Sequence, residues 1–128
     1  MSLDLPRSID NADVLLDALT VGAHDRHELA AVRVLAAGSF LSRGDFQDLA
    51  IIVDHLRCRV LWRRVHDCLT FSSIPLSGDE RRLLCIALSL TGRHAVDLSE
   101  VLGRLDPGLA PAVLGALATA IPSTEETP

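Results

Sequence analysis

The sequence contains no lysine and no tyrosine, and aromatic residues make up only 3% of its 128 positions. Hydrophobic residues nevertheless make up 48%, so a core must be built from leucine, valine, isoleucine and alanine, which suit closely packed helices. All twelve basic residues are arginine. We attribute this bias to the codon usage of a GC-rich bacterial genome and assign it no binding role.

The sequence also lacks the signatures of export, of a membrane span and of a disulfide framework. Its three cysteines, Cys58, Cys68 and Cys85, form no CxxC pair, and the N-terminal MSLDLPRSID lacks the basic and then apolar run of a secretory signal. No apolar run approaches the ~20 residues that cross a bilayer. A long charge-free stretch, 109–124, contains two prolines. These absences predict a cytoplasmic protein without a membrane partner.

Glycine-rich phosphate loops are absent, because the eight glycines are scattered and form neither GxGxxG nor GxxxxGKS/T. This excludes the common nucleotide-dependent enzymes, and we expect no cofactor. The formal net charge of -5 repels polyanions, so nucleic-acid binding would need a local basic patch.

Helix start signals divide the chain into about six helices. Asp25, Asp45, Ser77 and Asp97 each precede an acidic residue by three positions, as a helix N-cap does. Strict alternation typical of strands is absent. The sequence therefore predicts an all-α fold, a compact bundle in one domain over residues 1–121, with a disordered tail at 122–128. The expected helices cover residues 11–20, 25 to the break at 42–44, about 45–70, 77–91, 97–106 and 111–121.

The long central helix predicted at about 45–70 has two apolar faces. The apolar residues of its first half, from Phe46 to Val60, cluster on one side, and those of its second half lie on nearly the opposite side. Either the other helices of the chain cover both faces, or a second chain covers one of them. We expect a homodimer whose interface is formed by Trp62, Leu61, Val65 and Leu69.

The predicted C-terminal helix, 111–121, carries no charged side chain and places Ala112, Ala116 and Ala120 four residues apart. A helix that is apolar all round is expected to be buried all round. Small residues on one stripe allow close approach of another helix, inside the core or at a subunit interface. We favour the core.

Four arginines, Arg57, Arg59, Arg63 and Arg64, surround Trp62 and supply the ingredients of a nucleic-acid contact. On a helix Arg59 and Arg63 share one face while the other two point elsewhere, so a solvated, salt-bridged surface is the simpler interpretation. The apolar helix at 111–121 lacks the donors and acceptors of a DNA-recognition helix.

Histidines offer two further groupings. His24 and His27 could converge on one metal ion, but acidic residues beside them are already explained by helix capping, and we expect no metal site. His55 and His66 lie on one stripe of the predicted long helix, where surface histidines are the simpler interpretation.

No convergent catalytic set emerges from these residues. We therefore expect a non-enzymatic helical protein-interaction or regulatory module that self-associates through an apolar helix face. The alternative is a nucleic-acid-associated regulator that uses the segment 57–64, with Arg59 and Arg63 as its contacts.

Overall fold

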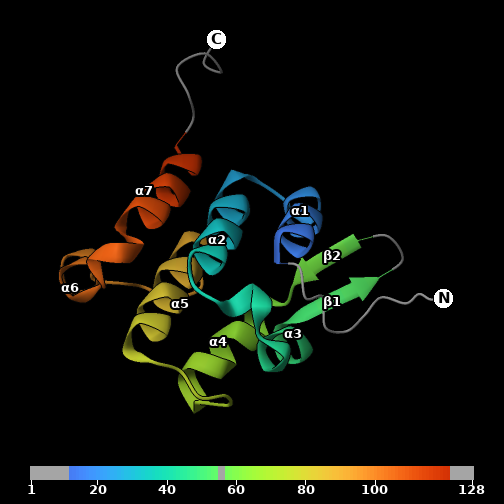
Figure 1. Cartoon of the computed structure of the whole chain (residues 1–128), viewed down its shortest axis with the longest axis horizontal. Helices are drawn as coiled ribbons and strands as arrows, with labels where there is room; N and C mark the ends of the chain where they lie inside the picture. Colours follow the sequence, from blue (N-terminus) through green and yellow to red (C-terminus); the bar gives the residue numbers. More distant parts are fainter. Residues whose placement is uncertain (1–11, 55–56, 122–128) are drawn as a thin grey trace, which may run out of the picture.

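Short helices make up most of the computed structural model, which describes residues 12–54 and 57–121 (Figure 1). The predicted all-α class is confirmed, since the only sheet in these residues is a small two-stranded one. The elements in chain order are α1 (Ala12–Gly22), α2 (Arg26–Ala37), the 3-10 turn η1 (Phe40–Ser42), α3 (Gly44–Ala50), β1 (Ile51–Asp54), β2 (Arg57–Val60), α4 (Trp62–Phe71), α5 (Gly78–Leu90), α6 (Leu98–Arg104), the 3-10 turn η2 (Pro107–Leu109) and α7 (Ala110–Thr119).

Side-chain caps begin three of the described helices, as their sequence patterns predicted. The cap predicted at Asp45 is wrong, because Asp45 lies inside the first turn of α3 and the N-cap position is Arg43. The side chain of Asp25 accepts a hydrogen bond from the Glu28 backbone N–H at 2.8 Å. Ser77 and Glu80 form a reciprocal capping box at the start of α5, and the Asp97 side chain accepts from the backbone N–H of the residue three positions later at the start of α6. Each cap satisfies backbone donors that a helix leaves unpaired at its N-terminus.

The predicted long helix at about 45–70 is wrong, and so is the predicted absence of strands. Helix α3 ends at Ala50, and the chain then forms an antiparallel hairpin in which Ile51 pairs with Val60. Consecutive β-branched side chains, Ile51 to Val53, favour extended backbone at this point. In β2 exposed and buried residues alternate. The change of apolar face therefore marks a change of element.

Helix α2 lies at the centre of the helical packing. It contacts α5 on one side and α7 on another, while α1 packs against β2 and α4 packs against α5 (Figure 1). Its residues Ala30, Ala31, Val34 and Leu35 are fully buried, and small side chains among them let neighbouring helices approach closely. Helix α7 and the hairpin lie at opposite ends of the molecule in Figure 1.

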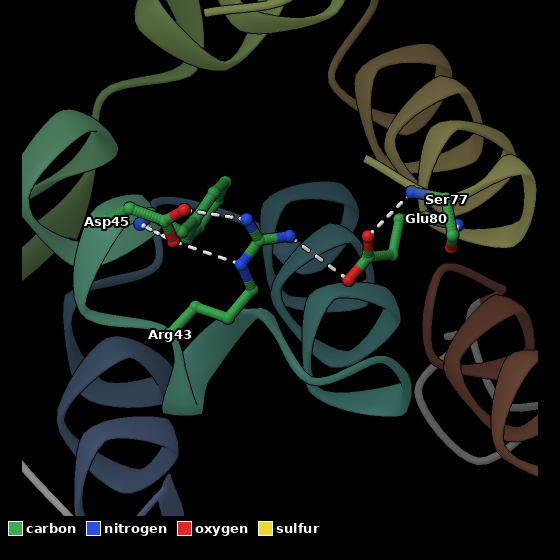
Figure 2. Close-up of polar contacts among 5 residues, drawn as sticks. Arg43, Asp45, Ser77 and Glu80 are labelled. Atoms are coloured by element: carbon green, nitrogen blue, oxygen red, sulfur yellow. Dashed lines mark hydrogen bonds and ion pairs between the residues drawn. The ribbon is translucent and has the colours of Figure 1, made fainter. Parts of the chain in front are cut away.

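A polar network ties the start of α3 to the start of α5 (Figure 2). The Arg43 guanidinium donates two hydrogen bonds to Asp45, at 2.9 and 2.6 Å, and a third to Glu80 at 3.2 Å. These bonds raise the pKa of Arg43 and lower the pKa of Asp45, the largest cause in each case being the hydrogen bond between the two side chains. Glu80 also completes the capping box of α5, so one carboxylate serves two elements.

Several sequence predictions fall on residues outside those described. The tail predicted at 122–128 is one of them, and His55 is another.

Within 12–54 and 57–121, no single helix is long and apolar enough to cross a membrane. The α6 segment and residues 107–119 meet the length and composition criterion only as a pair, bent by 109°.

Candidate functional site

The interface predicted around Trp62 lies inside the chain's own core. Trp62 is only 5% exposed and Val65 is fully buried, while Leu61 and Leu69 are half-buried. These residues belong to or flank α4, which packs against α5 and α3. Trp62 and Val65 are thus covered by the chain itself, and self-association remains a prediction.

Trp62 is held by a buried hydrogen bond that the sequence did not reveal. Its indole Nε1 donates to Glu28 Oε2 at 2.8 Å, and the other oxygen of this carboxylate accepts from the His24 backbone N–H at 2.7 Å. Glu28 is only 8% exposed. Both of its oxygens are therefore occupied by donors, as burial of a carboxylate requires. The spacing of Asp25 and Glu28 indicated only a helix cap. The bond to the indole could not be predicted from such a local pattern, because Trp62 lies 34 residues away along the chain.

A cleft of about 540 Å³ opens beside this pair. Its walls are the first turn of α2, Arg59 and Trp62, and residues 89–93 at the end of α5. Side chains that carry or can acquire positive charge line it from three elements: His24, His27, Arg59 and Arg93. Its volume falls within the range of small-molecule sites, roughly 300–1,000 Å³.

Asp25 is the second carboxylate at the cleft. The hydrogen bond from the Glu28 backbone N–H lowers the pKa of Asp25, and the charges of His24 and His27 act in the same direction. Asp25 is thus held ionised as a helix cap at neutral pH.

The four arginines proposed for nucleic-acid binding are divided between two elements. Arg57 and Arg59 lie on the outward face of β2, because Cys58 and Val60, which alternate with them along the strand, are buried. Arg63 and Arg64 are exposed in the first turn of α4. Of the four, Arg59 alone lines the cleft. The helical geometry used to group Arg59 with Arg63 does not apply, and the nucleic-acid hypothesis stays a prediction.

The histidines and cysteines of the described residues do not form a metal-binding cluster. Among the residues that the structure describes, no three His, Cys, Asp or Glu side chains gather where they could hold a metal ion. His66 makes an edge-to-face ring contact with His94, with centroids 5.9 Å apart. Burial raises the pKa of the thiols of all three cysteines, so the fraction present as thiolate is reduced.

Helix α7 presents an exposed apolar face. Only Val113 and Ala116 of this helix are buried, and its packing is mainly against α2. The prediction that the charge-free helix is buried all round is therefore wrong. Leu114 is 61% exposed and Ile121, just beyond the helix, is 67% exposed. We define the α7 face by its exposed residues on the side away from α2: Pro111, Leu114, Gly115, Ala118 and Ile121.

Helix α6 adds to this apolar end of the molecule. It has no buried residue, and its Leu98 and Leu102 are exposed. In Figure 1 it lies next to α7 at one end.

Comparison of the chain with protein-family models, with curated proteins and with solved structures found no significant match to any of them.

Proposed function

We propose that this protein is a non-enzymatic helical interaction module that self-associates through the α7 face. The observation that carries the proposal is a helix without a charged side chain that buries only two residues in its own chain. Soluble monomers rarely leave large contiguous apolar surfaces exposed, and such surfaces mark interaction sites.

A second copy of the same chain fits this face for two reasons. Each chain has a formal net charge of -5, so two copies repel one another, and an uncharged contact adds no further like-charge pair. Gly115 has open space where a Cβ would lie, and with Ala118 it lets a partner helix approach closely. A twofold axis would place the same patch of both chains in contact.

The direct test is the molar mass in solution, measured by light scattering over a range of concentrations and at two salt levels. We expect a dimer that added salt does not weaken, because the contact is apolar and salt screens the repulsion between the two negatively charged chains. Leu114→Glu places a charge at the centre of the α7 face and should yield a monomer.

Val21→Glu is the matched control. Val21 is 82% exposed at the end of α1 and does not belong to the α7 face, so this variant should remain a dimer. A wild-type monomer at every concentration would contradict the proposal. Equal loss of the dimer in both variants would show that added negative charge, not the α7 face, determines association.

A further inference from the structure

The cleft beside α2 contains two carboxylates that already accept hydrogen bonds and two arginines, Arg59 and Arg93, that keep unused donors. Both oxygens of Glu28 accept hydrogen bonds within the protein, and Asp25 caps the helix. The guanidinium of Arg59, by contrast, forms no hydrogen bond or ion pair with any residue in the described part of the chain. The acidic groups of the cleft therefore support the fold, and the basic groups face the space between its walls.

Arg59 is positioned by the hairpin. It stands opposite Ile52 in the register of the two strands, on the face turned away from the buried Cys58 and Val60. A strand paired along its length fixes the direction of this side chain better than a loop would.

Arg93, which also lines the cleft, is positioned by the end of α5. Gly92 takes a left-handed conformation with φ 79°, and the backbone N–H of Arg93 donates to Leu88 at 2.9 Å. This Schellman ending requires the positive φ that glycine adopts without strain. One guanidinium nitrogen of Arg93 contacts the Thr91 carbonyl at 3.3 Å, which leaves its remaining donors for a ligand.

We infer that this cleft binds the phosphate group of a small molecule, held between Arg59 and Arg93 with His24 and His27 beside it. Arginine donors bind phosphate oxygens through charge-assisted hydrogen bonds. Donors that reach the cleft from separate walls suit a tetrahedral anion better than a planar carboxylate, which one guanidinium can satisfy alone. The N-terminus of α2 is already capped by Asp25 and is not the source of the attraction. The α7 face takes no part in this site.

Trp62 provides the readout, because it lines the cleft and is the only tryptophan. Inorganic phosphate is titrated into the whole protein at constant ionic strength while tryptophan emission is recorded. We expect a saturable change, with the dissociation constant raised about tenfold in Arg59→Gln and in Arg93→Gln. Arg57→Gln, on the same face of β2 but outside the cleft, should bind as the wild type does.

Three outcomes would overturn the inference. One is a response to phosphate that does not saturate, and a second is equal weakening by Arg57→Gln and Arg59→Gln. The third is an equal response to acetate, or to a short oligonucleotide where phosphate alone has no effect. Circular dichroism of each variant confirms that the fold is retained.

Discussion

At the scale of single residues, the hydrogen bond between Trp62 and Glu28 joins two elements at a buried position. The carboxylate belongs to the first turn of α2 and the indole to the first residue of α4. A buried acceptor that loses its partner retains the cost of its desolvation, about 1–3 kcal/mol, and more when it is charged. The pair therefore fixes where α4 begins relative to α2.

Replacing Trp62 by Phe should destabilise the protein by roughly 1–3 kcal/mol, because Glu28 Oε2 then lacks its donor at 2.8 Å. Glu28→Ala removes the acceptor, and the double variant should lose less than the sum of the two single losses, by about 0.5–3 kcal/mol. Urea unfolding followed by circular dichroism measures all three. Losses that add to within about 0.5 kcal/mol would show that the two side chains are not coupled.

At the scale of elements, the chain shows what local patterns can and cannot predict. The caps at Asp25, Ser77 and Asp97 were predictable because a cap and its partner are three residues apart. The hairpin was missed because the two residues between its strands, His55 and Leu56, are neither glycine nor proline. Its second strand, β2, packs against α1, a contact distant in sequence. Helical periodicity fitted each half of 46–70 and could not reveal the break between them.

The contact between α1 and the hairpin depends on Gly22. A Cβ at this position would overlap the carbonyl oxygen of Cys58, so Gly22→Ala forces β2 away from α1. We expect a loss of about 1–3 kcal/mol, as overpacking of a core typically costs. Gly103→Ala is the control, since nothing lies near its Cβ position in α6. That change should be neutral or stabilising by up to about 1 kcal/mol. Thermal unfolding of both variants checks the difference, and equal melting temperatures would refute the close contact.

At the scale of the whole molecule, the two candidate sites lie on different elements. The composition of 111–121 correctly identified a helix free of charge, but composition alone could not say which elements would cover it. Coverage depends on the position of α6, which contacts α5 and leaves the α7 face exposed. The cleft was not predictable either, since its walls come from residues as far apart as His24 and Arg93.

The one-sided attachment of α7 also determines how the molecule opens. Its links to α2 include a hydrogen bond from Arg33 to Thr119 at 3.0 Å and the burial of Val113 and Ala116, whereas α2 is packed on several sides. Segments with few buried contacts open at lower free energy than the global core. Deuterium should therefore enter the backbone amides of α7 sooner than those of α2 or α5 in dilute protein, and more slowly as the concentration rises and copies pair. Mass spectrometry of the exchanged peptides would refute this if α7 were as protected as α2 at every concentration. If α7 instead exchanges early and slows with concentration, α7 of the monomer alternates between docked and detached forms. Pairing of two copies would then complete the packing of this helix.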